Sequence, residues 1–137
     1  MNNSVNAVFK RGRNFSVEAN GHTIEIDTKK ESGGDDIGPS PKIFMLLSLA
    51  GCTGFDIVSI LEKMRVSFSD LSISVDGHLT DSQPAIYDQV TIHYSIKLNN
   101  DDRPKMEKAV KLSEEKYCGV SRMFKSFAKV DFKIHYL

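Results

Sequence analysis

The chain has 137 residues, of which 40% are hydrophobic and 26% charged, so its composition is that of a folded domain and excludes a mainly disordered chain. The 18 Lys and Arg residues balance the 18 Asp and Glu residues, so no net charge attracts the protein to nucleic acid or to an anionic membrane surface. The length predicts a single domain over residues 1–137. The first residues are polar and basic and contain no apolar core of a secretory signal, so we expect a cytoplasmic protein.

Three stretches of alternating apolar and polar residues open the chain, and this pattern is typical of half-buried strands. Their apolar positions are Val5, Ala7 and Phe9, then Phe15, Val17 and Ala19, then Ile24 and Ile26. Gly12 lies between the first two stretches and Asn20-Gly21 between the last two, and these residues tolerate the positive φ of tight turns. We therefore predict a three-stranded meander, followed by a loop rich in Gly, Pro and charge over residues 29–41.

Residues 42–65 are strongly apolar and contain no proline, which predicts a helix of about 20 residues. The segment 43–61 approaches the length of a membrane span. Asp56, two glycines and several hydroxyl side chains oppose that interpretation, so we expect a core helix that is buried on most of its circumference. A chain this short has few elements with which to cover such a helix, and we therefore predict a homodimer.

The second half of the chain predicts three strands and two helices. Alternation at 71–75, 90–98 and 130–136 predicts strands, the first two as a long antiparallel pair. An acidic pair at 101–102, followed by a proline in the first turn, predicts a helix that continues to about residue 117. Gly119 should break this helix, and a short helix should follow over residues 120–127.

Two cysteines are the candidate reactive residues. Cys52 lies in the middle of the apolar helix between Gly51 and Gly54, each of which costs about 1 kcal/mol of helix stability relative to alanine. The missing side chains allow either close backbone packing or the approach of a small substrate to the sulfur. Cys118 lies at the junction of two helices, where the N-terminus of the second would lower the pKa of the thiol. The alternative for both cysteines is a structural role as small buried residues.

Other motifs are missing or weak. The four histidines are dispersed and no two cysteines or histidines stand at ligand spacing, so we expect neither a metal nor a cofactor. No nucleophile elbow, phosphate-binding loop or dinucleotide fingerprint occurs. Asp56 follows Cys52 by one helical turn and is an unfavourable neighbour for a thiolate, so we expect its side chain to cap or bond a nearby strand.

Two stretches of the chain resemble motifs of the OsmC/Ohr superfamily, the osmotically inducible and organic-hydroperoxide-resistance proteins. Residues 38–65, GPSPKIFMLLSLAGCTGFDIVSILEKMR, are similar to the proline-entered central helix with Gly-Cys in its middle. Residues 112–124, LSEEKYCGVSRMF, are similar to the second cysteine motif. The resemblance implies an α+β fold in which antiparallel sheets wrap around the paired central helices of an intertwined homodimer, with sites at the subunit interface.

The resemblance also implies an activity, the thiol-dependent reduction of organic hydroperoxides. It makes Cys52 the peroxidatic cysteine and Cys118 the resolving cysteine, and it implies an external dithiol that regenerates both thiols.

The sequence departs from the peroxidase pattern at the start of the central helix. Peroxidase members carry a glutamate there that holds an arginine against the thiolate, whereas this chain has Lys42 and Ile43. Arg11 and Arg13 lie in the first hairpin, and Arg13 is our candidate for the arginine. The departure leaves open a non-catalytic dimer of the same fold that binds a small apolar ligand, or a structural or partner-binding protein of a stress response.

Overall fold

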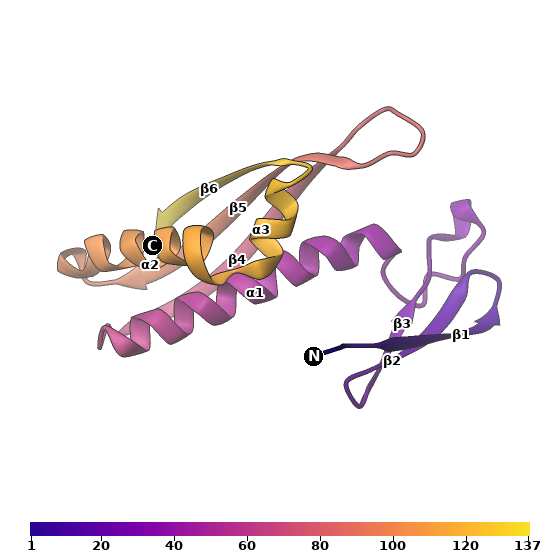
Figure 1. Cartoon of the computed structure of the whole chain (residues 1–137), viewed down its shortest axis with the longest axis horizontal. Helices are drawn as coiled ribbons and strands as arrows, with labels where there is room; N and C mark the ends of the chain where they lie inside the picture. Colours follow the sequence, from indigo (N-terminus) through magenta and orange to yellow (C-terminus); the bar gives the residue numbers. More distant parts are fainter. The chain divides into compact units, whose positions relative to one another are not determined.

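A computed structural model describes all 137 residues, which form two compact units, Met1–Met45 and Leu46–Leu137. The first unit contains an antiparallel sheet in the order β1–β2–β3 (Figure 1). Its strands are β1 (Val5–Arg11), β2 (Asn14–Ala19) and β3 (His22–Ile26). Gly12, Asn20 and Gly21 have positive φ angles of 53°, 52° and 80° in the two turns. The predicted meander and both of its turns are therefore confirmed, but the expected half-burial is wrong for β1, whose residues are all exposed.

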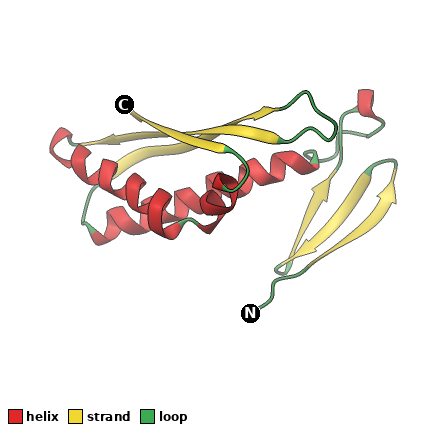
Figure 2. Ribbon diagram, turned by 45° about the horizontal axis from the view of Figure 1, so that its top comes forward, coloured by secondary structure: helices red, strands yellow, loops and turns green.

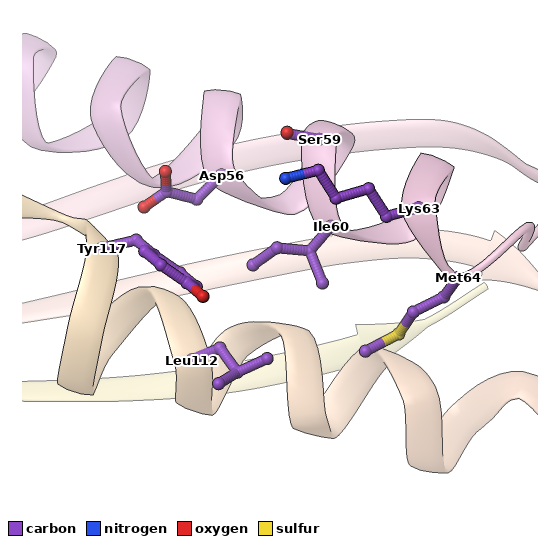
Figure 3. A pocket seen from close by; sticks show the side chains of 7 residues that line it. All are labelled: Asp56, Ser59, Ile60, Lys63, Met64, Leu112 and Tyr117. Atoms are coloured by element: carbon purple, nitrogen blue, oxygen red, sulfur yellow. The ribbon is translucent and has the colours of Figure 1, made fainter.

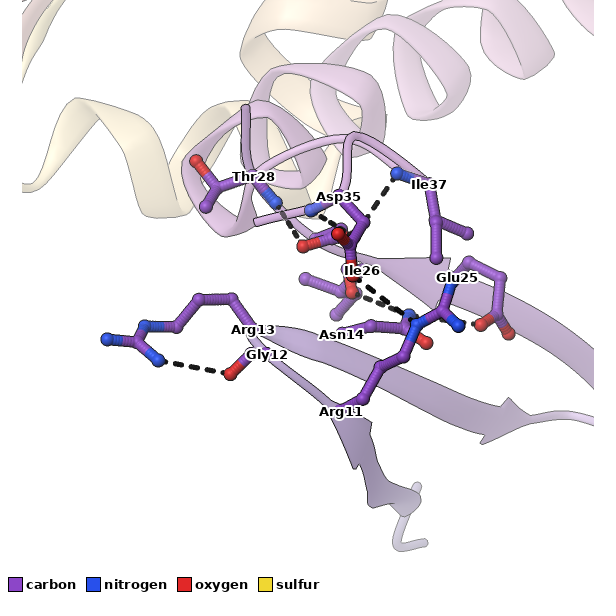
Figure 4. A network of polar contacts seen from close by, with 10 residues as sticks. Arg11, Gly12, Arg13, Asn14, Glu25, Ile26, Thr28, Asp35 and Ile37 are labelled. Carbon is purple, nitrogen blue, oxygen red and sulfur yellow. Dashed lines mark hydrogen bonds and ion pairs between the residues drawn. The ribbon is translucent and has the colours of Figure 1, made fainter. Parts of the chain in front are cut away.

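The loop after β3 is organised around the buried carboxylate of Asp27. This carboxylate accepts backbone N–H groups from Thr28 at 2.8 Å, Asp35 at 3.3 Å and Ile37 at 3.2 Å (Figure 4). Arg11 adds an ion pair from its Nε to Asp35 Oδ2 at 3.3 Å. A short 3-10 turn, η1 (Lys30–Ser32), lies within this loop. One buried carboxylate thus fixes a segment that has no regular pattern in its sequence.

The long helix α1 (Pro41–Lys63) begins with proline and covers the predicted range. It is long and apolar enough to cross a membrane by length and composition alone. Only 17% of its most apolar window is buried in the single chain, and the expected burial on most of the circumference, which requires a second subunit, stays a prediction. Leu47 and Phe55 are 57% and 81% exposed. Within the second unit one three-stranded sheet packs against this helix, and a sheet covers one helix face.

The second unit is a three-stranded sheet with helices packed on one face (Figures 1 and 2). Its remaining elements are β4 (Phe68–Leu79), β5 (Tyr87–Leu98), α2 (Arg103–Leu112), α3 (Gly119–Lys125) and β6 (Lys129–Tyr136). Short helical turns, η2 (Asn100–Asp102) and η3 (Ser113–Tyr117), flank α2. Fully buried core residues come from α1 (Leu49, Ile57, Leu61), β5 (Val90, Ile92, Tyr94, Ile96) and α2 (Met106, Ala109, Val110). The core thus lies between the central strand and the two longer helices.

Two details of the second unit differ from the expectation. The antiparallel arrangement holds for β4 and β5, but β6 is parallel to β5. A parallel neighbour needs a crossover connection, and the segment from α2 to α3 provides it. The helix predicted to end near residue 117 does end there, with η3 as a π-helical last turn, but the break falls at Cys118 and Gly119 already belongs to α3.

Candidate functional site

The fold brings the two cysteines together. The Sγ atoms of Cys52 and Cys118 and a carboxylate oxygen of Asp56 all lie within 4.8 Å of one another. Cys52 and Asp56 stand one turn apart on α1, and Cys118 is the N-cap residue of α3. Both cysteines are free thiols. We call these three residues the thiol–carboxylate cluster.

The two glycines beside Cys52 have different surroundings. A Cβ on Gly54 would lie 3.1 Å from Ile73 Cδ1, so this glycine allows α1 to approach β4 closely. A Cβ on Gly51 would have nothing within 4 Å, and this residue is exposed. Close packing therefore explains Gly54, while Gly51 leaves open space next to Cys52 in the helix.

Cys118 is buried, and its surroundings shift the pKa of its thiol. The backbone N–H of Ser121 donates a hydrogen bond to its Sγ at 3.2 Å, as expected for a residue at a helix N-terminus. Burial and a hydrogen bond with Cys52 nevertheless raise the pKa of Cys118 to about 12. The N–H group of Ser121 at the helix terminus does lower this pKa, as predicted, but the loss of hydration on burial is the larger effect and the net change is upward. Cys52 is the more exposed of the two thiols.

Asp56 is held by a residue far along the chain. Its Oδ2 accepts a hydrogen bond of 2.8 Å from Ser113 Oγ, at the start of the π-helical turn η3. The expectation that Asp56 caps or bonds a nearby strand is wrong. The only sequence signal for its place in the site is the spacing of four residues from Cys52, which puts both on one helix face.

Glu114 is a second site residue that the sequence did not reveal. Its buried carboxylate accepts hydrogen bonds from Tyr94 Oη at 3.4 Å and Ser121 Oγ at 3.0 Å. Lys125 Nζ lies 3.5 Å from Glu114 Oε2 and donates to the Glu114 carbonyl at 2.7 Å. Burial and the neighbouring Glu114 raise the pKa of Tyr94. This network ties η3 and α3 to the sheet on both sides of Cys118.

Two cavities lie next to the thiol–carboxylate cluster. A cavity of about 420 Å³ opens between α1 and α2 (Figure 3). Its lining residues are Asp56, Ser59, Ile60, Lys63, Met64, Leu112 and Tyr117. A second cavity of about 340 Å³ is lined by Tyr117, Cys118, Arg122 and neighbouring residues. The cluster thus borders solvent-accessible space through Asp56 on one side and through Cys118 on the other.

The candidate arginine and the substituted glutamate positions lie in the first unit. Arg13 is exposed in the turn between β1 and β2, where its Nη1 donates to the Gly12 carbonyl at 3.0 Å (Figure 4). Lys42 and Ile43 lie in the first turn of α1, and ten residues from Lys42 to Cys52 correspond to about 15 Å along the helix axis. That spacing is too long for the Lys42 side chain to contact the Cys52 thiol directly. The role of Arg13 stays a prediction.

Comparisons with known proteins agree with the fold and with the cysteine motifs. The family model described as OsmC-like protein matches residues 33–133, which include both cysteines. Protein YhfA of Escherichia coli (strain K12) is 29% identical over 112 residues, covering 82% of this chain and 81% of that protein.

Solved structures match the chain from end to end. A hypothetical protein from Aquifex aeolicus VF5 is 26% identical with a TM-score of 0.81, covering 100% of this chain and 98% of that one. An organic hydroperoxide resistance protein OsmC from Legionella pneumophila shares the fold at 20% identity and a TM-score of 0.74, covering 98% and 97% of the two chains. The predicted α+β fold and the resemblance are confirmed, and the chain belongs to the OsmC-like protein family.

Proposed function

We propose that this protein is a thiol-dependent reductase of organic hydroperoxides in which Cys52 and Cys118 form the redox pair. The observation that carries the proposal is the placement of the two sulfur atoms within 4.8 Å of each other, from distant parts of the sequence. Membership of the OsmC-like family and the fold shared with an organic hydroperoxide resistance protein support a redox function related to peroxides.

The reaction has three steps. The thiolate of Cys52 attacks one oxygen of the hydroperoxide, an S–O bond forms and the O–O bond breaks, so Cys52 becomes a sulfenic acid. The alkoxide leaves and takes up a proton to become an alcohol. The thiol of Cys118 condenses with this sulfenic acid, so that an S–S bond forms and water leaves. A dithiol reductant then reduces the disulfide to two thiols and is itself oxidised to a disulfide.

Burial and charge support this order of events. Cys52 is the more exposed thiol, so a substrate reaches it first. Cys118 is buried and its pKa is raised to about 12, so it remains a thiol until the sulfenic acid forms beside it. Arg13 is the cation that we propose for the Cys52 thiolate, and Arg13→Ala should then slow the first step and leave the condensation unchanged.

We further propose that the working unit is a homodimer. The face of α1 that carries Leu47 and Phe55 is apolar and exposed in the single chain. Isolated exposed apolar residues are common, but a helix with this much exposed apolar surface is typical of a covered interface. A second copy would cover the face of α1 that is exposed in the single chain.

The alternative of a non-catalytic dimer that binds a small apolar ligand has weaker support. The cavity of about 420 Å³ is large enough for a small ligand, but Asp56 and Lys63 contribute charged groups to its lining. A purely apolar ligand would leave both groups without water.

Free-thiol titration separates the two functions. Addition of a stoichiometric amount of cumene hydroperoxide to the reduced protein should remove both free thiols, and peptide mapping without reductant should recover Cys52 and Cys118 in one disulfide-linked fragment. If both thiols remain after treatment, the redox proposal is wrong and ligand binding becomes the better explanation.

Single variants test the assigned roles. Cys52→Ser should abolish turnover, whereas Cys118→Ser should leave a sulfenic acid on Cys52 that labels with dimedone. A dimedone label on Cys118 of the Cys52→Ser variant, with turnover preserved, would show that the roles are reversed.

A further inference from the structure

The thiol–carboxylate cluster has the composition of a metal site. Thiolate and carboxylate are ligands of Zn²⁺, with Zn–S distances of about 2.3 Å and Zn–O distances of about 2.0–2.2 Å. In a tetrahedral site these distances place the ligand atoms about 3.3–3.8 Å apart. The three atoms of the cluster already lie within 4.8 Å of one another, so a contraction of at most about 1.0–1.5 Å brings them to ligand spacing.

Hydrogen bonds orient two of the three groups. Ser113 Oγ donates to Asp56 Oδ2 at 2.8 Å, which leaves the other carboxylate oxygen available. The backbone N–H of Ser121 donates to Cys118 Sγ at 3.2 Å. Metal ligands are usually held by such outer contacts, which fix their orientation before the ion arrives. The cluster is therefore oriented by groups that would not themselves ligate the ion.

The cluster is also accessible to a small ion. Cys52 and Asp56 are half-buried, and the cavity of about 420 Å³ reaches Asp56. The cavity of about 340 Å³ reaches Cys118 from the other side. Three protein ligands with adjoining open space leave a fourth position for water, as in zinc sites that are not fully closed by protein ligands.

We propose that Cys52, Asp56 and Cys118 of the reduced protein bind a thiophilic divalent cation of the zinc class. Binding of Zn²⁺ replaces the protons of the two thiols, so two protons are released, and the ion with two thiolates and one carboxylate carries a net charge of −1. A Cys52–Cys118 disulfide has no thiolate to offer. The ion and the disulfide therefore exclude each other, and the ion would protect the reduced thiols from oxidation.

The test uses the full chain, reduced with a phosphine and freed of metal with a chelator. Titration with Cd²⁺ should produce the ultraviolet thiolate-to-metal band at one ion per chain, and competition with a chromophoric chelator gives the affinity for Zn²⁺. Binding should release two protons per ion in a weakly buffered solution. Absence of the band, or saturation well below one ion per chain, overturns the proposal.

Variants test each ligand separately. Cys52→Ser and Cys118→Ser should each lower the affinity for Zn²⁺ by more than the roughly 10- to 100-fold typical of outer contacts, and Ser113→Ala should lower it by about tenfold. Asp56→Asn keeps the size of the side chain and should lower the affinity more than Ser113→Ala does. The matched control is Asp101→Asn, an exposed aspartate of η2, which should bind Zn²⁺ as the wild type does.

The outcomes distinguish this site from the proposed function. If Asp56→Asn folds, by circular dichroism, and binds Zn²⁺ as the wild type does, the three-ligand site is wrong. If the metal-free protein forms the disulfide with hydroperoxide but binds no ion, the metal site fails and the redox function stands. If the protein binds the ion but forms no disulfide with hydroperoxide, the metal site stands and the redox function fails. When both occur, stoichiometric Zn²⁺ should slow disulfide formation.

Discussion

The backbone N–H of Ser121 donates a hydrogen bond of 3.2 Å to Cys118 Sγ, yet the pKa of this thiol is raised to about 12. Burial is the largest cause, and the hydrogen bond with Cys52 is the next. A helix of seven residues provides too little stabilisation of a thiolate to offset the loss of hydration at this depth. Reactivity at this site therefore depends on Cys52 more than on Cys118.

Removal of the Cys52 thiol should lower the pKa of Cys118. The variant Cys52→Ala removes both the hydrogen bond and the charge interaction through which Cys52 raises that pKa, while burial remains. The measurement is the pH dependence of Cys118 alkylation, followed by mass spectrometry of the peptide that contains it. Ser59→Ala, an exposed change further along α1, is the control. An unchanged alkylation midpoint in Cys52→Ala would contradict the assigned cause.

Gly77 should be the glycine of the sheet that tolerates a side chain least. A Cβ there would lie 2.8 Å from two ring atoms of Tyr87 and 2.9 Å from Leu46 Cδ2. Because Tyr87 is buried, Gly77→Ala should destabilise the protein by about 1–3 kcal/mol, as overpacking does. Urea unfolding of the reduced protein measures the change. Gly119→Ala, whose Cβ would meet nothing within 4 Å, should show no loss, and equal midpoints for both variants would refute this account.

Local patterns predicted the elements well because each pattern has a direct physical cause. The alternating residues Phe15, Val17 and Ala19 do lie in strand β2, although Phe15 is 38% exposed, and Asn20-Gly21 accepts the positive φ that its turn requires. The helix α1 begins with Pro41, where a missing N–H has no consequence. These features depend on neighbours within a few residues, and the sequence displays them directly.

Long-range relationships were not contained in those patterns. Alternation in β6 is the same for either strand direction, so its parallel pairing with β5 follows from the crossover and not from its residues. The pairing of Cys52 with Cys118 came from the family resemblance, since their spacing in the sequence has no meaning before folding. Glu114 lies in a charged run that predicts a solvated surface, and only the folded chain brings Tyr94 to it.

Replacement of Phe55 tests the homodimer. Its side chain is 81% exposed on the apolar face of α1, so Phe55→Asp adds a charge to that face without disturbing the core of one chain. Light scattering should give the wild type twice the chain mass of 15.3 kDa and the variant a single chain mass. Leu79→Asp, at the end of β4, is the control for a charge on an exposed apolar site and should remain dimeric. A wild type of 15.3 kDa with native circular dichroism would exclude the dimer.

The pair His78–Asp88 should make stability depend on pH. Nδ1 of His78 lies 2.7 Å from Asp88 Oδ1, and this hydrogen bond and the carboxylate charge raise the pKa of His78. Because the pKa of His78 is higher in the folded state, the protonated pair stabilises the protein below about pH 6.5, the ordinary pKa of histidine. This contribution to stability is lost as the pH rises through the pKa of His78 in the folded state. Asp88→Asn should remove it.

Two measurements check that pair. Nuclear magnetic resonance should show a lower titration midpoint for His78 in Asp88→Asn than in the wild type. The difference in unfolding midpoint between the two proteins should be larger at pH 5.5 than at pH 8.5. A midpoint for His78 that is the same in both proteins would mean that Asp88 does not hold the proton.

The distance in sequence between Cys52 and Cys118 has a thermodynamic consequence. The segment that joins them contains β4, β5 and α2, which is most of the second unit. A bond between the two sulfurs would close a loop of more than sixty residues. In the chain-entropy account, closing such a loop lowers the conformational entropy of the unfolded state, which raises the free energy of unfolding by about 4 kcal/mol. Oxidation would then make global unfolding rarer and reduction would make it more frequent. The redox state of one pair of atoms would thereby set the lifetime of the whole fold against proteolysis.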